Sequence, residues 1–196
     1  MKKILMSVAA VAILAGGVGA CTAYTSGGDP SPQLTFANYQ PIQLNVARTA
    51  VETAYEVPND PQDVSSQFVV SPAEAVKRYA ENRFLARGTP DGDFTVTILD
   101  ARVHMKVLKE DSRVLKWAGA GQEDEYRVFL KVKVTPRPDG VVRAPSTIIR
   151  HERTLVMPSS ATLAEREMKQ IDFLEKLIAD VDVKVMELLD STPSIR

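Results

Sequence analysis

The sequence predicts one α+β domain, in which a single four-stranded, mostly antiparallel sheet carries two helices packed on one face. Three observations lead to this prediction. Several segments alternate apolar and polar residues, which is typical of strands with one buried face. Two other segments repeat apolar residues every three or four positions, as amphipathic helices do. Both of these segments begin with a pattern that caps helices. The expected order is strand, helix, three strands, helix.

The first strand is expected within residues 42–55. Ile42, Leu44 and Val46 alternate with polar residues, and the alternation changes phase near Ala47. Either a bulge or a break in the strand would explain this change.

The first helix is expected over residues 72–87. Ser71 and Glu74 form a capping-box pattern at its start, and Pro72 occupies the first helical position, where its missing N–H does no harm. Gly88 follows as a typical stop signal.

Three further strands are expected over residues 94–107, 126–134 and 147–157. The first of these changes phase near Asp100, which indicates one long bent strand with a bulge. The second has the most regular alternation and is expected to be a central antiparallel strand with one wetted face. The third has a charged middle, residues 150–153, which favours an edge strand protected by charge.

The second helix follows the capping box of Thr162 and Glu165 and is expected to run for about 28 residues, or roughly 42 Å. Its apolar side chains recur at helical spacing: Met168, Ile171, Leu174, Ile178, Val181, Val185 and Leu188. This stripe is too apolar to face water, so the helix either covers the sheet or joins a partner in a coiled coil. The last residues, 191–196, are expected to fray.

The chain begins with a processing signal. Lys2 and Lys3 precede an apolar run over residues 4–15, which is broken only by Ser7, and small residues lead to Cys21. About 12 apolar residues are too few to cross a bilayer, so the pattern indicates an export signal.

The residues Val18-Gly19-Ala20-Cys21 resemble the lipobox of bacterial lipoproteins. The resemblance implies that the Cys21 thiol receives diacylglycerol, that the chain is cut before it, and that its new amino end is acylated, typically with palmitate. Residues 1–20 are then the signal peptide and residues 21–40 a lipidated, flexible tether rich in Gly, Ser and Pro. Residues 41–190 form the domain.

The residue after the lipobox cysteine bears on location. It is Thr22 rather than an aspartate. In a bacterium with two membranes, the lipoprotein sorting pattern therefore implies the outer membrane, with the domain facing the periplasm.

Composition excludes several classes of function. The 196 residues contain 24 Lys+Arg and 25 Asp+Glu. Because the signal peptide holds two of the basic residues and no acidic one, the mature chain carries 22 against 25, a net charge of −3. Nothing in this balance points to a nucleic-acid partner, which needs a strongly basic face. A single cysteine excludes an internal disulfide.

No catalytic or metal-binding set is recognised. His104 and His151 lie on separate strands without the acidic or cysteine neighbours of a metal site, so ordinary strand histidines are expected. Gly119 and Gly121 lie between two strands, where a phosphate-binding loop lacks its helix. Asp100 is expected to make a bulge hydrogen bond. We therefore expect no cofactor, no metal and no enzymatic activity.

Two surfaces are candidate contacts. Residues 109–125 form a long connection that contains Leu115 and Trp117, which either fold back over the core or touch a partner or membrane. A basic row on two strands is either a solvated face or a surface for acidic lipid headgroups. Beside His104, this row comprises Arg102, Lys106, Arg127, Lys131 and Lys133.

The element order behind a lipobox resembles the periplasmic lipoproteins that assist envelope transport, namely the lipopolysaccharide-assembly lipoprotein and the auxiliary lipoproteins of ABC-type lipid transporters. This resemblance implies a noncatalytic binding or assembly component with an envelope protein as partner, and it carries over no functional residue except Cys21. Two alternatives remain. One is a periplasmic carrier of a small apolar ligand or lipid between helix and sheet. The other is an enzyme of unknown type.

Overall fold

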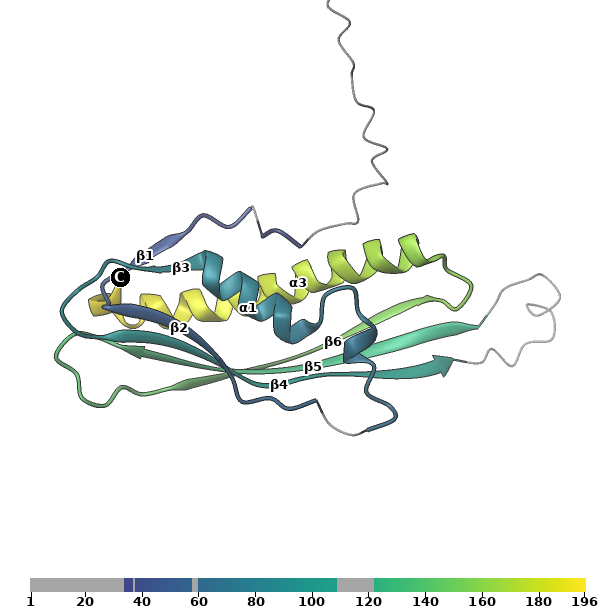
Figure 1. The fold of residues 1–196 in the computed structure, drawn as a ribbon, viewed down its shortest axis with the longest axis horizontal. Coiled ribbons are helices and arrows are strands. Elements are labelled where there is room, and N and C mark those ends of the chain that lie inside the picture. Colours follow the sequence, from purple (N-terminus) through teal and green to yellow (C-terminus); the bar gives the residue numbers. More distant parts are fainter. Residues whose placement is uncertain (1–33, 37, 58–59, 109–121) are drawn as a thin grey trace, which may run out of the picture. The chain divides into compact units, whose positions relative to one another are not determined.

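A computed structural model describes residues 34–36, 38–57, 60–108 and 122–196. Its main sheet has the order β2-β4-β5-β6, and β2 runs parallel to β4 while the other pairs are antiparallel (Figure 1). The strands are β2 (Arg48–Thr53), β4 (Asp93–Leu108), β5 (Glu123–Arg137) and β6 (Thr147–Pro158). The α+β class and the four-stranded sheet are thus confirmed, with β5 central and β6 at an edge.

Both long helices cover the same face of this sheet (Figure 1). They are α1 (Pro72–Arg83) and α3 (Leu163–Asp190). The Ser71 hydroxyl caps α1 by accepting from the Glu74 backbone N–H at 3.2 Å. At the start of α3, Thr162 and Glu165 make the reciprocal bonds of a full capping box. No described helix covers the opposite side of the sheet, which we call the open face.

The structure corrects the end of the first helix. α1 ends at Arg83 rather than at residue 87, and Phe84–Ala86 forms a short strand, β3, that pairs in parallel with β1 (Ile42–Leu44). The reason is packing, because the buried ring of Phe84 lies 5.7 Å from the Tyr79 ring and 4.8 Å from the Phe94 ring, centroid to centroid. The phase change after Leu44 is a strand break between β1 and β2.

Helix α3 covers the sheet, which decides between the two expected roles of its apolar stripe. Leu174, Leu177 and Ile178 are fully buried in the core that it shares with the sheet. The expected stripe is wrong at its first residue, because the side chain of Met168 is 64% exposed. No described helix is long and apolar enough to span a membrane.

A β-bulge bends β4 where the sequence predicted it. Ile98 pairs with Val132 and Asp100 with Lys131, so Leu99 has no partner on β5. The extra residue lets side chains on both sides of the bulge reach the same core, although their sequence parity differs. Phe94, Val96, Ile98, Ala101 and Val103 are all buried.

The domain is larger at both ends than residues 41–190. Leu34 and Phe36 are buried, and the Phe36 ring packs edge-on against Tyr79 of α1. A 3₁₀ turn at Pro193–Ile195 buries Ile195, whose carbonyl accepts a 2.8 Å hydrogen bond from the Asn45 backbone N–H. The expected fraying of residues 191–196 is therefore wrong, because Ile195 fills a place in the core.

Candidate functional site

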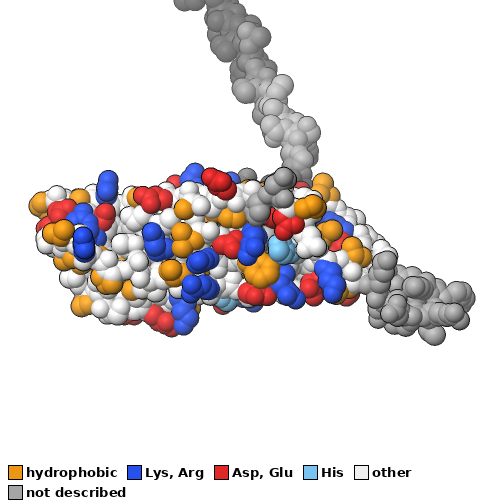
Figure 2. Space-filling model, turned by 90° about the horizontal axis from the view of Figure 1, so that it is seen from below, with side chains coloured by type: hydrophobic (Ala, Val, Ile, Leu, Met, Phe, Trp, Pro, Cys, Tyr) orange, Lys and Arg blue, Asp and Glu red, His pale blue; other side chains and the backbone are white. Residues whose placement is uncertain are grey.

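The open face is built from alternate residues of β4, β5 and β6, which the strand register places in rows. One row is Asp100, Lys131 and Arg150, and the next is Arg102, Phe129 and Glu152. Figure 2 looks onto this face and shows Lys and Arg side chains spread over it among carboxylates. On β4 to β6 the face includes seven cations (Arg102, Lys106, Arg127, Lys131, Lys133, Arg137 and Arg150) and five anions (Asp93, Asp100, Glu123, Glu125 and Glu152). This face is therefore net +2 on a chain of net charge −1.

Three of the five carboxylates of the face are engaged by Arg102 and Arg127, and Asp93 pairs with Arg137 at 2.8 Å. Arg102 pairs with Asp100 at 3.0 Å, and Arg127 lies 3.4 Å from Glu125 and 3.5 Å from Glu152. Because Arg102 and Arg127 occupy these carboxylates, the other cations of the face do not pair with them.

Four cations of the face form no ion pair with a described residue. Within the described residues, Lys106, Lys131, Lys133 and Arg150 have no carboxylate within the 4.0 Å of an ion pair. Lys131 and Arg150 are also directly opposite each other across β5 and β6. Like charges in this position repel and destabilise the sheet. A bound anion between them would relieve this repulsion.

Phe129 lies at the centre of the face. The Arg102 guanidinium carbon is 5.3 Å from the centre of its ring, in a cation–π geometry. The His104 ring meets the same phenyl ring edge-on at 5.3 Å. Arg102 and His104 thus both pack against the Phe129 ring.

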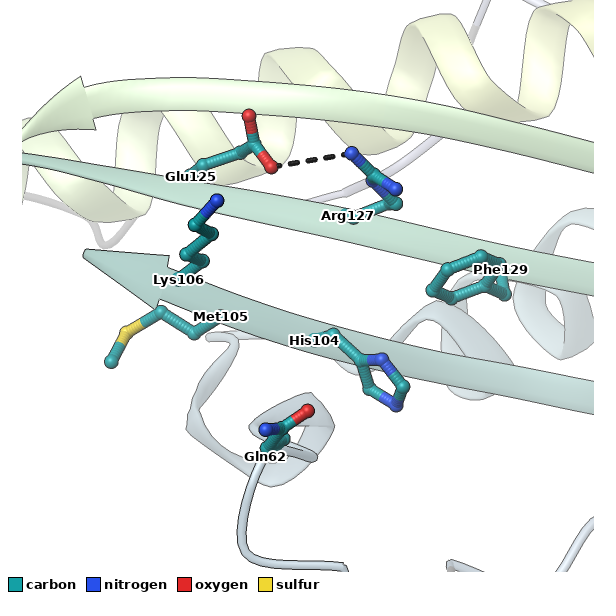
Figure 3. Close-up of a pocket in the computed structure, with 7 residues that line it drawn as sticks. All are labelled: Gln62, His104, Met105, Lys106, Glu125, Arg127 and Phe129. Atoms are coloured by element: carbon teal, nitrogen blue, oxygen red, sulfur yellow. Dashed lines mark hydrogen bonds and ion pairs between the residues drawn. The ribbon is translucent and has the colours of Figure 1, made fainter. Parts of the chain in front are cut away.

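Two hollows share Phe129 as part of their lining. The first has a volume of about 300 Å³, and Figure 3 shows it between β4, β5 and the loop that carries Gln62. Its other lining residues are His104, Met105, Lys106, Glu125 and Arg127. The second, of about 380 Å³, is lined by Asp100, Arg102, Leu130, Lys131, Arg150, His151 and Glu152. Both are open and contain several charged side chains, although apolar surface predominates in the second. The charged side chains suit a charged ligand or protein surface.

Asp63 fixes the loop beside the first hollow. Its Oδ1 accepts from the backbone N–H groups of Ser65 at 2.9 Å and Val103 at 3.2 Å. Its Oδ2 accepts from the Tyr55 hydroxyl at 3.1 Å. Burial, together with the nearby Asp63 charge, raises the pKa of Tyr55 to about 12. The Asp60 carboxylate of the same loop lies 3.5 Å from His104 Nε2.

The two histidines do not meet. His104 on β4 faces the open side, whereas His151 on β6 binds Asp180 of α3 at 2.9 Å on the helix side, and β5 lies between the two strands. Asp100 makes the expected bulge bond, because its Oδ1 accepts from the Arg102 backbone N–H at 3.3 Å. The described residues contain no group of three or more His, Cys, Asp or Glu side chains placed to hold a metal ion.

The structure brings together the five residues of the predicted basic row, Arg102, Lys106, Arg127, Lys131 and Lys133, on one face. Sequence reasoning missed Arg150 and the central role of Phe129. The charged middle of the β6 segment was a signal for Arg150, but only the β5–β6 register shows that it lies beside Lys131. Cys21, Leu115 and Trp117 lie outside the described residues.

Comparison with known proteins finds remote similarity in structure alone. No protein-family model matches the sequence, and no curated protein is significantly similar to it. Among solved structures, a minor lipoprotein from Acinetobacter baumannii is 9% identical with a TM-score of 0.34, and the match covers 78% of this chain and 96% of that one. Rare lipoprotein B from Shewanella oneidensis is 13% identical with a TM-score of 0.36, and the match covers 72% and 98%. At this distance, neither protein assigns a role to any residue of this chain.

Proposed function

We propose that this chain is a noncatalytic bacterial lipoprotein, anchored by lipid at Cys21 to the outer membrane and facing the periplasm. Its domain acts as a binding component of an envelope transport assembly. The anchor is argued from the Val18–Cys21 lipobox behind an export signal. The observation that carries the binding role is the open face, where seven cations outnumber five anions on a chain that is acidic overall.

The proposed occupant of this face is an acidic surface of an envelope protein. Lys106, Lys131, Lys133 and Arg150 are the cations that the face offers to it, because none of them pairs with a carboxylate among the described residues. Charges of this kind steer association and select partners, and their effect falls as salt increases. Anionic lipid headgroups, the other role considered for the basic row, are an outcome that the test below distinguishes.

The alternative of an apolar-ligand carrier finds little room in the described structure. A hollow between α1 and β2, lined by Ala80, Phe84 and Phe94 among others, measures about 100 Å³. Ligand pockets usually measure about 300–1,000 Å³. Another hollow, beside α3 and lined by Tyr126, Arg166 and Gln170 among others, measures about 180 Å³. The hollows of about 300 and 380 Å³ lie on the open face.

Two measurements test the proposal. Mass spectrometry of the membrane-extracted protein should find Cys21 as the lipidated first residue, and Cys21→Ser should release the chain from the membrane fraction. An unmodified Cys21 would refute the anchor. A pull-down with the lipidated protein from envelope extracts should then recover an envelope protein.

The binding face is tested by charge reversal in the same pull-down. Lys131→Glu/Lys133→Glu should lower recovery of the envelope protein at least about tenfold, whereas Lys77→Glu/Lys169→Glu, with the same charge change on the helices, should not. If both double variants recover the partner equally, the open face is not the binding surface. If wild type recovers no protein but binds anionic vesicles better than neutral ones, the occupant is a headgroup and the protein partner is rejected.

A further inference from the structure

The edge of the main sheet at β6 is available to another strand. β6 is the outermost strand and pairs over its length with β5, while its other side meets no described strand. It has 12 residues, about 40 Å, whereas the opposite edge strand, β2, has 6. A long free edge presents a row of backbone donors and acceptors that can template a further strand.

The side chains along this edge are arranged to leave it accessible. All of the open-face residues of β6 are exposed, namely Ile148, Arg150, Glu152, Thr154, Val156 and Pro158. On the helix side, Asp180 of α3 binds His151 at 2.9 Å and also binds Arg153. Because these contacts with α3 already fix the position of β6, the strand loses little conformational entropy when it pairs with another strand.

We propose that two copies of this chain associate by antiparallel pairing of β6 with β6, in the register that places His151 opposite His151 of the second copy. In this register Arg150 lies directly opposite Glu152 of the other copy, and the two-fold symmetry makes that contact twice. Opposite charges directly across a strand pair stabilise the pairing. The occupant of the edge is thus a second copy, because the charges of β6 complement themselves.

The neighbouring registers are unfavourable. A register centred on Glu152 would place two carboxylates opposite each other, and one centred on Arg150 would do the same with two guanidinium groups. A shift by one residue would place open-face side chains opposite helix-side ones, which antiparallel pairing forbids.

The pairing determines how the helices and the open faces of the two copies are arranged. A two-fold axis perpendicular to the sheet keeps the helices of both copies on one side and joins the two open faces into one eight-stranded surface. Each copy contributes a face of net +2, so the basic surface doubles. Phe36 packs on α1, so both chains enter their domains on the helix side. If the chains are lipidated as proposed, both anchors can therefore lie in one membrane.

Charge exchange tests the proposal on the full lipidated chain in detergent, with sedimentation equilibrium over a range of concentrations. Wild type should dimerise. Arg150→Glu and Glu152→Arg should each weaken dimerisation at least about tenfold, and the double exchange should restore it. Lys77→Glu on α1 should leave it unchanged. A monomeric wild type at every concentration, or a double variant as weak as the single ones, would overturn the proposal.

Disulfide crosslinking tests the register. His151→Cys should form a covalent dimer on mild oxidation, and Glu152→Cys should not, because Arg150 lies opposite it. Wild type, with Cys21 as its only cysteine, gives the background. Faster crosslinking of Glu152→Cys would overturn the register and the charge argument with it. Lys131→Glu/Lys133→Glu should dimerise normally even where it loses the envelope partner, which separates this inference from the proposed function.

Discussion

Tyr79 of α1 and Asp182 of α3 are joined by a 2.5 Å hydrogen bond from the phenol hydroxyl to the carboxylate Oδ1. The same oxygen accepts from Nε of Arg83 at 3.0 Å. The Arg83 and Asp182 side chains are only 12% and 13% exposed. One carboxylate thus satisfies two largely buried donors and fastens the two helices to each other.

Asp182→Ala should therefore destabilise the domain by about 2–4 kcal/mol, because it leaves the Tyr79 hydroxyl and the Arg83 guanidinium without their shared acceptor. Urea unfolding measures this loss. Asp172→Ala is the matched control, since Asp172 pairs with Lys176 on the exposed side of α3 and should cost less than about 0.5 kcal/mol. Equal losses of unfolding free energy for the two variants would show that the bonds of Asp182 between the helices stabilise the domain no more than an exposed ion pair does.

Tyr55 makes the stability of the domain depend on alkaline pH. Burial raises the pKa of its hydroxyl to about 12 from the ordinary value of 10.0, so the fold favours the protonated form. The stabilisation is complete below about pH 10 and is lost as pH rises through about 12. Unfolding free energies measured across this interval should fall less steeply for Tyr55→Phe than for wild type. If the unfolding free energies of the two proteins fell equally steeply with pH, the raised pKa of Tyr55 would be contradicted.

Gly92 and Gly140 separate two costs of adding a side chain. Both have positive φ, +90° and +72°, but a Cβ at Gly92 would lie 2.9 Å from the Arg137 carbonyl oxygen, whereas a Cβ at Gly140 meets nothing within 4 Å. Gly140→Ala should cost about 1–2 kcal/mol for backbone strain alone. Gly92→Ala should cost clearly more, because the contact is with backbone that must shift. Thermal unfolding of the two variants makes the comparison, and an equal shift would count against the clash.

Ile195 should behave as a core residue. Its side chain is fully buried, so Ile195→Ala should cost about 2–4 kcal/mol. Val183→Ala, at a side chain of α3 that is 56% exposed, should change stability by no more than about 0.5 kcal/mol. Chemical denaturation of both variants distinguishes a docked segment from a frayed one, for which neither change would matter.

Local patterns were sufficient for most of the fold. The Thr162–Glu165 capping box and the spacing of Leu174, Ile178 and Val181 predicted α3, because caps and amphipathic periodicity act within a few residues. The phase slip at Asp100 predicted the bulge for the same reason. The α1 boundary at Arg83 was missed, because Phe84 leaves the helix to pack between Tyr79 and Phe94, a contact that no local pattern reveals.

The binding face was predictable only in part. Alternation placed Arg102, Lys106 and Arg127 on one side of their strands. Which cations remain without carboxylates depends on pairing between strands, as between Arg127 of β5 and Glu152 of β6. The repulsion between Lys131 and Arg150 likewise follows from register alone. Such relationships are set by tertiary structure and not by neighbours in sequence.

The unpaired Leu99 of β4 also determines where this strand tolerates a change in length. Removing Leu99 would join Ile98 directly to Asp100. Their partners on β5, Val132 for Ile98 and Lys131 for Asp100, are already consecutive. Every other side chain would keep its face. A single deletion elsewhere in β4 would instead move every side chain between the deletion and the bulge to the opposite face of the sheet. Charged side chains would then point into the core. Natural length variation within this strand should therefore concentrate at its bend.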